Sequence, residues 1–525
     1  MSANPGTTAP TGRNKPAQGK ERSDAALGHA AQNTPSPEGA KESVEWPVVK
    51  SGELLAFVTS GSRGWAKYYA ESGPLFLRIG NLDHDSVALD LRDLQRVAPP
   101  AGAEGTRTKV QASDILISIT ADVGMIGLVP STLGEAYINQ HVALARPLPT
   151  VHPPYLAWCL TSPKAQRQFL QLQRGATKVG LGLDDIRAVD VPLPPLPEQR
   201  RIVAEIEKQF TRLEAGLAAL RRVQANLKRY RAAVLKAACE GRLVPTEAAL
   251  ARSPRATKNG PPAYETGEAL LARILTERRQ NWQGRGQYKE PAAPDTRNVA
   301  TVPEGWTWAS VDQLADETMI GLDRGRAQQS ADPATGVPYI KMNNVTMDGR
   351  VHCDELVFVP ASREEATRFS VQDGDILFNT RNSKELVGKV GLVRNPPAGA
   401  IYNNNLMRIR VPAGVSQAFL ALQMCSHEFR QRMELVKKAT TSVAAVYSKD
   451  LLPLAIALPP LAEQTRIVAE VERRLSVVEE LESVVTANLQ RATRLRQSIL
   501  QKAFTGELTR EATCKEGLQV QTNRR

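Results

Sequence analysis

The sequence predicts an α+β protein in which two mixed α/β domains are joined by two long helices that form an antiparallel coiled coil, with a pseudo-two-fold internal repeat. Three observations predict this fold class. The chain has 525 residues, which is too long for one ordinary domain. A proline-rich motif that opens a helical pattern occurs twice. Each copy of that motif follows a divergent region with short β-rich runs.

The repeat is clearest in the segments PPLPEQRRIVAE, residues 194–205, and PPLAEQTRIVAE, residues 459–470. The same offset of 265 residues continues to Leu235 and Leu500, and the similarity extends upstream more weakly. A run of this length at one offset indicates an internal duplication. Each unit is therefore a variable domain followed by a closely matched helix.

Both helices carry inward-facing positions at alternating steps of mostly three and four residues, which is the spacing of a seam for another helix. Pro-Pro and Glu-Gln mark each start, and Gly241 and Gly506 mark the ends. Roughly forty residues at about 1.5 Å each give a length of about 60 Å. The predicted seam comprises Ile206, Phe210, Leu213, Leu217, Leu220, Gln224, Leu227, Tyr230 or Arg231, and Val234, and then Ile467, Val471, Leu475, Val478, Leu481, Val485, Leu489, Ala492, Leu495 and Ile499.

The charges of the two helices predict their relative direction. The second half of the first helix is basic, with no acidic residue between Glu214 and Glu240. The first half of the second helix is rich in glutamate. Antiparallel pairing places these opposite charges together, whereas parallel pairing stacks like charges. The alternative is that each helix packs separately on its own domain.

The upstream domains are predicted to be mixed, with strands near 114–119 and 375–378 and a helix after each, over 154–173 and 416–437. A charged helix over 264–282 is either solvated or a docking surface for a partner. The predicted boundaries are 1–42 for a disordered tail, 43–195 for the first domain, 196–240 for the first long helix, 241–305 for a central helical region and linker, 306–460 for the second domain, 461–505 for the second long helix and 506–525 for a C-terminal tail.

Charge and composition narrow the function classes. The net charge of +12 and a pI near 9.5 favour a polyanionic partner, although ribosome-associated and membrane-surface proteins have a similar balance. The five cysteines are scattered and never form a C-x-x-C pair, which indicates a reducing cytosol. With neither a signal peptide nor an apolar run long enough for a bilayer, we expect a soluble cytoplasmic protein.

No catalytic or metal-binding motif is recognised. The sequence Asn395-Pro-Pro-Ala398 lacks the aromatic ring on which an amino-methyltransferase stacks a flipped base. Neither an E-x-K nuclease triplet nor a phosphate-binding P-loop occurs. His352 beside Cys353 is the nearest approach to a metal pair and is read as two neighbours on a strand. We therefore expect no catalytic residue and no metal ligand, with an enzyme of unrecognised centre as a remote alternative.

Polar loops over 60–69 and 379–384 differ between the two copies and are rich in side chains that contact phosphates and base edges. Each variable domain also has a Gly-Asn or Asn-Asn strand end and a Tyr-x-Asn segment. Together with the duplicated motif, these features resemble the specificity (S) subunit of type I restriction-modification systems. The resemblance covers roughly residues 46–510.

The resemblance implies two target recognition domains, each reading one half of a bipartite, asymmetric site in double-stranded DNA, with the helices setting the gap. It also implies two methylation (M) subunits that bind S-adenosylmethionine, and restriction (R) subunits that use ATP and Mg²⁺, while this chain holds no cofactor. Whether R subunits accompany it stays open. The competing interpretation is an independent DNA-binding regulator or scaffold on the same frame.

The site residues that the resemblance implies lie on variable loops and at the helix starts. For Asn81 and Asn344, bracing a turn is an equal alternative to contacting DNA. For Tyr68 and Tyr69, the alternative is packing in the core. The predicted DNA contacts are Arg63, Trp65, Lys67, Tyr68, Tyr69, Arg78, Asn81, Asn139, Gln140, His141, Lys341, Asn343, Asn344, Arg381, Asn382, Lys384, Asn403, Asn404 and Asn405. The predicted subunit interface is Glu198, Gln199, Arg201, Ile202, Glu463, Gln464, Arg466 and Ile467.

Overall fold

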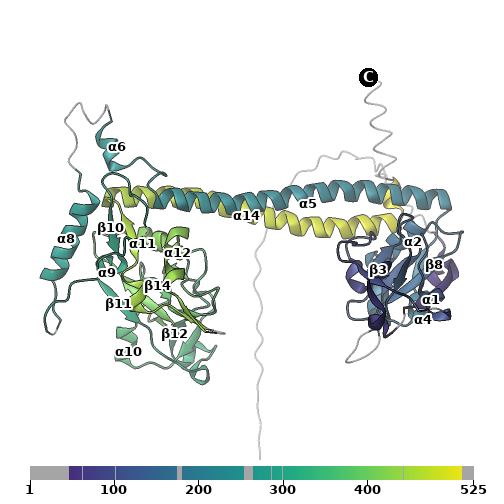
Figure 1. Cartoon of the computed structure of the whole chain (residues 1–525), viewed down its shortest axis with the longest axis horizontal. Helices are drawn as coiled ribbons and strands as arrows, with labels where there is room; N and C mark the ends of the chain where they lie inside the picture. Colours follow the sequence, from purple (N-terminus) through teal and green to yellow (C-terminus); the bar gives the residue numbers. More distant parts are fainter. Residues whose placement is uncertain are drawn as a thin grey trace, which may run out of the picture.

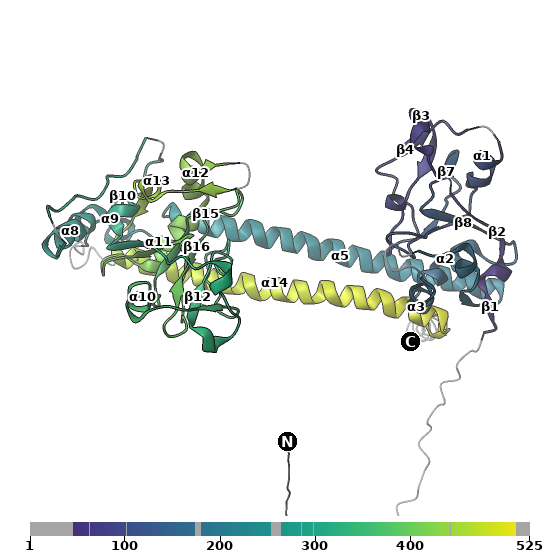
Figure 2. The same cartoon turned by 90° about the horizontal axis from the view of Figure 1, so that it is seen from below.

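Two mixed α/β domains lie at opposite ends of a pair of long helices (Figure 1). A second view, turned by 90°, shows the same separation of the domains (Figure 2). This arrangement confirms the predicted fold class. The computed structural model describes residues 46–510 except 62, 101, 174–179, 254–263, 285, 298 and 441–442. The predicted tail over 1–42 and the segment from 511 onward, with Cys514, lie outside the described residues.

The long helices are α5 (Leu196–Cys239) and α14 (Leu461–Phe504), each of 44 residues. At about 1.5 Å per residue each is about 66 Å long. Both follow a proline, whose fixed φ suits the start of a helix. Gly241 and Gly506 follow the ends with φ of +67° and +78°. That left-handed conformation, which glycine adopts without a Cβ clash, stops each helix.

The first domain contains two small sheets and a strand pair. The larger sheet is antiparallel, and the second sheet combines one parallel and one antiparallel pairing. The sheets are β2 (Leu55–Ser60), β8 (Val142–Pro147), β5 (Ile115–Ser118) and β6 (Ile126–Leu128) in that order, then β4 (Gln95–Val97), β3 (Tyr69–Leu77) and β7 (Ala136–Ile138), and the pair β1 (Val48–Lys50) with β9 (Asp190–Pro192).

The second domain repeats this topology strand for strand, and its described residues also form a small three-stranded sheet. Its order is β11 (Glu317–Ile320), β18 (Leu406–Arg410), β14 (Ile376–Asn379) and β16 (Val390–Leu392), then β13 (Val357–Val359), β12 (Val337–Ile340) and β17 (Ile401–Tyr402), the pair β10 (Thr307–Ser310) with β21 (Ala455–Leu458), and the additional β15 (Arg381–Asn382), β20 (Ala444–Ala445) and β19 (Lys438–Ala439). The shared strand order confirms the internal repeat.

Each domain has two consecutive helices where the sequence predicted one. The segments predicted over 154–173 and 416–437 both break at a serine, Ser162 or Ser426. The hydroxyl of each serine accepts from the backbone N–H three residues later and so starts a new helix. The helices of the domains are α1 (Ala103–Thr108), α2 (Pro153–Leu160), α3 (Pro163–Leu172), α4 (Leu183–Arg187), α9 (Val311–Leu314), α10 (Arg363–Arg368), α11 (Gln417–Cys425), α12 (His427–Val436) and α13 (Ser448–Leu451).

The central region contains the short helix α6 (Glu247–Ala251) and the longer helix α8 (Gly267–Gln280). The helix predicted over 264–282 is α8. It was predicted to be either solvated or a docking surface for a partner, but one of its faces packs inside this chain. Leu270 and Ile274 are 0% and 2% exposed and belong to the core of the second domain. The apolar face of this charged helix therefore extends the second domain.

Both ends of the helix pair are built into domain cores. Ile206 at the start of α5 and Ile499 near the end of α14 share the core of the first domain. At the other end, Val234 of α5 and Val471 of α14 pack with Trp306. Because each domain contacts both helices, the frame and the domains form continuous packing.

Between the domains, the two helices pair in antiparallel fashion, as predicted. Leu227 of α5 packs against Val478 and Val485 of α14. Arg231 forms an ion pair with Glu482 at 3.1 Å, so the basic half of α5 meets the acidic half of α14.

Two apolar seam predictions are wrong, since Leu481 and Leu495 are 44% and 48% exposed. At the position predicted as Tyr230 or Arg231, Tyr230 is 46% exposed and Arg231 lies nearer the seam. Arg496, which is 265 residues after Arg231, lies nearer the seam than Leu495. Arg496 stacks 4.2 Å from the ring centroid of Phe210 and pairs with Glu214 at 3.5 Å. A long arginine fills the seam with its stem and carries its charge to a glutamate of the facing helix.

Each long helix is anchored by a buried glutamine in its first turn. Gln464 accepts a hydrogen bond from Ser416 N at 2.8 Å and donates to Pro459 O at 3.0 Å. Gln199 makes the equivalent bonds, accepting from His152 N and donating to Pro194 O, both at 2.8 Å. The duplicated Glu-Gln motif therefore fixes each domain to its helix.

Replacing Gln464 with alanine is expected to destabilise the second half of the molecule by about 2–4 kcal/mol, because two buried backbone groups lose their partners. Urea unfolding of the full chain measures this change. Thr465→Ala, on the exposed side of the same turn, is the matched control and should stay within about 0.5 kcal/mol of the parent. Equal shifts in the two variants would contradict the anchoring role.

Candidate nucleic-acid interface

Several predicted contact residues are internal braces. Asn81 and Asn344, 2% and 7% exposed, accept hydrogen bonds from Arg78 N at 2.8 Å and Lys341 N at 2.9 Å. Their amide groups donate to backbone carbonyls, including Asp90 O at 2.8 Å. These asparagines hold the turn at the end of an equivalent strand in each domain, which corrects their prediction as DNA contacts.

Asn139 and Asn403 are a second pair of braces. They are 7% and 8% exposed and accept from the backbone N–H of His141 and Asn405, at 3.1 and 2.8 Å. Asn403 also donates to the hydroxyl of Tyr339. Their side chains are used within the fold, so the prediction that they contact DNA is wrong for both.

Trp65 is also a core residue. It is 2% exposed, stacks on Phe76 with ring centroids 5.6 Å apart and lies 5.7 Å from Tyr137. An aromatic residue in a polar loop resembles a stacking platform in sequence, but here the ring closes a small core beneath the loop. The prediction that it contacts DNA is therefore wrong.

The remaining predicted residues of the first domain reach its surface. Arg63 and Lys67 are exposed, and Lys67 lies 4.9 Å from the ring centroid of the half-buried Tyr68. Tyr69 is 44% exposed. The half-buried Arg78 pairs with Asp93, Gln140 lies 2.9 Å from the ring of His141, and His141 also bonds Thr120.

In the second domain, Asn343 and Lys384 are exposed. Lys341 donates to Gln329 at 2.8 Å and Asn382 to Asn379 at 2.8 Å, so both side chains are partly engaged. Asn405 is half-buried, and its carbonyl accepts from Asn379 and Thr380.

Two predicted residues of the second domain share one cavity. Arg381 and Asn404 line a hollow of about 320 Å³ together with Ile320 and Tyr447. Tyr447 is 48% exposed, and the ammonium of Lys438 lies 5.6 Å from its ring centroid. An arginine, an amide and an accessible ring are the groups that bind a phosphate, a base edge and a base face. Sequence reasoning missed Tyr447 and Lys438 because β20 is brought beside Arg381 only by folding.

The first domain has no matching ring at this place. Leu181 N donates to Ile119 O just as Val446 N donates to Thr380 O. The residue after Leu181 is Gly182, whereas the residue after Val446 is Tyr447. Two domains with one topology therefore present different chemical groups at equivalent sites.

Most of the predicted subunit-interface residues are used inside the chain. Gln199, Ile202, Glu463, Gln464 and Ile467 are at most 1% exposed, which corrects their prediction as a surface for another chain. Glu463 accepts from Trp306 Nε1 at 2.9 Å and Glu247 N at 3.0 Å, and burial raises the pKa of its carboxyl group.

The other three predicted interface residues are also engaged locally. Glu198 accepts from Thr509 and Arg201, and Arg466 pairs with Glu247 at 2.5 Å. An unpredicted surface lies along the helix pair instead. Val477 and Val484 of α14 are 50% and 51% exposed beside Leu481, and these three residues share one helical face.

Within the described residues, no group of three or more His, Cys, Asp or Glu side chains gathers as metal ligands would. None of the described helices has a stretch both long and apolar enough to cross a bilayer.

Comparison with known proteins gives a consistent result. Residues 104–220 match the family model described as the type I restriction modification DNA specificity domain. The EcoKI type I restriction enzyme specificity subunit of Escherichia coli K12 is 24% identical over 471 residues, and the StySPI subunit of Salmonella potsdam is 23% identical over 474. Each alignment covers 88% of both chains. A chain from a solved type I R-M system has a TM-score of 0.57 at 20% identity, covering 88% of this chain and 98% of its own, which is a likeness of fold.

Proposed function

We propose that this chain, which is similar to the type I restriction enzyme specificity subunits, reads a bipartite, asymmetric DNA site. Each domain reads one half, and the α5–α14 pair sets the gap between the halves. One observation carries the proposal: the two domains share a topology but present different side chains. In the second domain Arg381 and Tyr447 line a cavity, whereas in the first domain the residue in the place of Tyr447 is Gly182.

The geometry of the helix pair supports the role of a spacer. The domains are attached at the two ends of helices about 66 Å long, a span of about 19 base pairs at 3.4 Å each. Because both helices enter both cores, the distance between the domains is set by the coiled coil and not by a flexible linker. A fixed distance is what reading two separated half-sites on one duplex requires.

The proposal assigns the chemistry to other chains. This chain is non-catalytic, and M subunits carrying S-adenosylmethionine dock on the helical frame, where Val477, Leu481 and Val484 offer apolar area. Restriction subunits, where present, bring ATP and Mg²⁺. The chain acts in the cytoplasm, where its DNA target lies.

The test is to map methylated bases in a host with and without this chain, while its M subunit is present. We expect methylation at a motif with two unlike halves and a fixed unread gap, lost when the chain is absent. Purified alone, the chain should neither methylate nor cut DNA. A continuous motif, or tight specific binding by a chain that never copurifies with an M subunit, would favour an independent regulator and contradict the proposal.

A further inference from the structure

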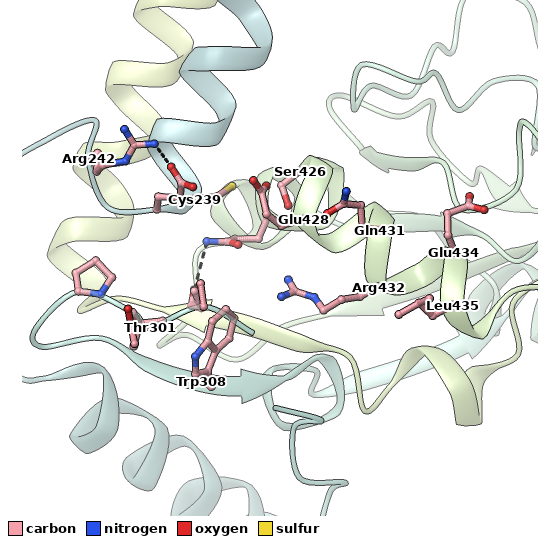
Figure 3. Close-up of a pocket in the computed structure, with 16 residues that line it drawn as sticks. Cys239, Arg242, Thr301, Trp308, Ser426, Glu428, Gln431, Arg432, Glu434 and Leu435 are labelled. Carbon is pink, nitrogen blue, oxygen red and sulfur yellow. Dashed lines mark hydrogen bonds and ion pairs between the residues drawn. The ribbon is translucent and has the colours of Figure 1, made fainter. Parts of the chain in front are cut away.

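A cavity of about 810 Å³ lies where the end of α5 meets α12 and the segment 300–303. Its walls come from the helix frame and from the second domain (Figure 3). None of the predicted DNA contacts and none of the predicted interface residues line it.

The cavity contains a half-buried arginine, Arg432, that forms no direct ion pair with any of the described residues, although the nearby Glu428 favours its charged form. The guanidinium of Arg432 lies 5.5 Å from the ring centroid of Trp308, and its Nε is buried with no hydrogen-bond partner. Figure 3 shows this side chain extending across the cavity. Burial lowers the pKa of Arg432, because an apolar wall disfavours its charged form. A buried charge is normally paired, so the site is complementary to an anion.

A buried oxygen of Glu428 that lacks a hydrogen-bond partner limits the kind of anion. Glu428 binds Lys236 through Oε1 at 2.8 Å, while its Oε2 is buried with no hydrogen-bond partner. The site therefore offers a donor at Arg432 and an acceptor at Glu428. A phosphate group presents only acceptors, so it can bind Arg432 but leaves Glu428 Oε2 without a donor. A peptide presents a side-chain carboxylate and a backbone N–H, which satisfy both.

The rim of the cavity supports a protein ligand over a nucleic acid. Glu240 and Glu434 lie at its edge, but Glu240 is paired with Lys236 and Arg242, and Glu434 is paired with Lys437, so neither glutamate leaves a free charge there. Leu435 at the same edge is 76% exposed, more than any other large apolar residue in the part of the chain that the structure describes. An apolar residue of the ligand, next to the ligand's own carboxylate, would cover Leu435.

In the described residues of the first half, the positions equivalent to Arg432 and Trp308 carry different side chains. Arg432 lies six residues after Ser426, and Gln168 lies six residues after the equivalent Ser162. Gln168 accepts from Asp190 N at 2.9 Å and donates to Asp190 O at 3.4 Å, so its polar atoms are satisfied. Val48 takes the place of Trp308 in the first half. Trp308 pairs with Ala457 and Val48 pairs with Pro192, and these two partners are 265 residues apart.

We propose that this cavity is a docking site for an acidic segment of a partner protein, with an aspartate or glutamate on Arg432 and a neighbouring apolar residue on Leu435. Because it exists in one half, it accepts one partner segment per chain and distinguishes the two ends of a frame that is otherwise pseudo-symmetric. This inference goes beyond DNA reading and does not depend on it.

The probe is the capped dipeptide acetyl-Asp-Leu-N-methylamide, titrated into the full chain with its six tryptophans replaced by 5-fluorotryptophan. The ¹⁹F resonance of Trp308, assigned with Trp308→Phe, should shift and saturate with one site. Acetyl-Asn-Leu-N-methylamide should bind at least about tenfold more weakly, since it lacks the charge. This comparison needs no variant and so does not depend on how a variant folds.

Arg432→Gln introduces the residue that the first half has at this position, Gln168, and should weaken binding of the aspartyl probe at least tenfold. Arg430→Gln is the matched control, because Arg430 lies on the same helix and binds Met347 O outside the cavity. Equal binding of the two probes, or undiminished binding by Arg432→Gln, would overturn the proposal. So would inorganic phosphate that displaces the probe at equal concentration. A chain that binds the probe but fails to read DNA would contradict only the function proposed above.

Discussion

Replacing Val485 with aspartate is expected to open the middle of the helix pair and to lower the free energy of unfolding by roughly 3–5 kcal/mol. Val485 is 5% exposed and packs against Leu227 and Val478. The new carboxylate would lie in an apolar seam without a partner. Hydrogen exchange of the α5 and α14 amides, together with urea unfolding, measures the effect.

The neighbouring residue supplies the control. Val484 lies on the same helix and is 51% exposed. Val484→Asp therefore adds the same charge, and changes the helix propensity by the same amount, as Val485→Asp. It should leave the exchange rates of the seam and the unfolding free energy within about 0.5 kcal/mol of the parent. If both variants open the pair, or neither does, the assigned seam is wrong.

Lengthening both helices by four residues is expected to move the two half-sites apart without changing either of them. Four residues add about 6 Å and about 40° of rotation to an α-helix. One base pair adds about 3.4 Å and about 34° in the same right-handed sense. Insertion of Ala-Ala-Leu-Glu after Gln224, which lies in the chain between Leu220 and Leu227 of the mid-seam cluster, and after Val485 of the same cluster should therefore lengthen the gap by one or two base pairs.

Methylated-base mapping with the M subunit present measures the new gap. Modification of the parental site should fall at least about 100-fold, the cost of roughly two mismatched base pairs. Insertion in one helix alone is the control, because it puts the seam out of register and should abolish specific methylation instead of shifting the gap. An unchanged gap in the double insertion would show that the helices do not set the spacing.

The frame was predictable because its information is local and repeated. The offset of 265 residues, the prolines before each helix and the complementary charges each indicate the same architecture. The choice of residue at each seam position was less predictable. Leu495 and Arg496 are adjacent, and only the register of the two helices decides that Arg496 turns toward Phe210 and Glu214 while Leu495 faces outward.

The candidate site was much less predictable than the frame. An asparagine in a loop can either contact a base or hydrogen-bond the backbone of a turn. The sequence alone does not distinguish these two uses. Asn81 and Asn344 prove to be braces because their partners are backbone groups up to twelve residues away. Tyr447 carried no sequence signal, since its place beside Arg381 depends on the pairing of β15 with β20.

Two independent readers on one frame should be exchangeable one at a time. The decisive experiment exchanges residues 46–192 for the corresponding domain of a specificity subunit with another target, and maps methylated bases with the M subunit present. We expect a motif in which one half changes to that of the donor, while the other half and the gap stay as in the parent. A change in both halves, or in neither, would contradict this independence.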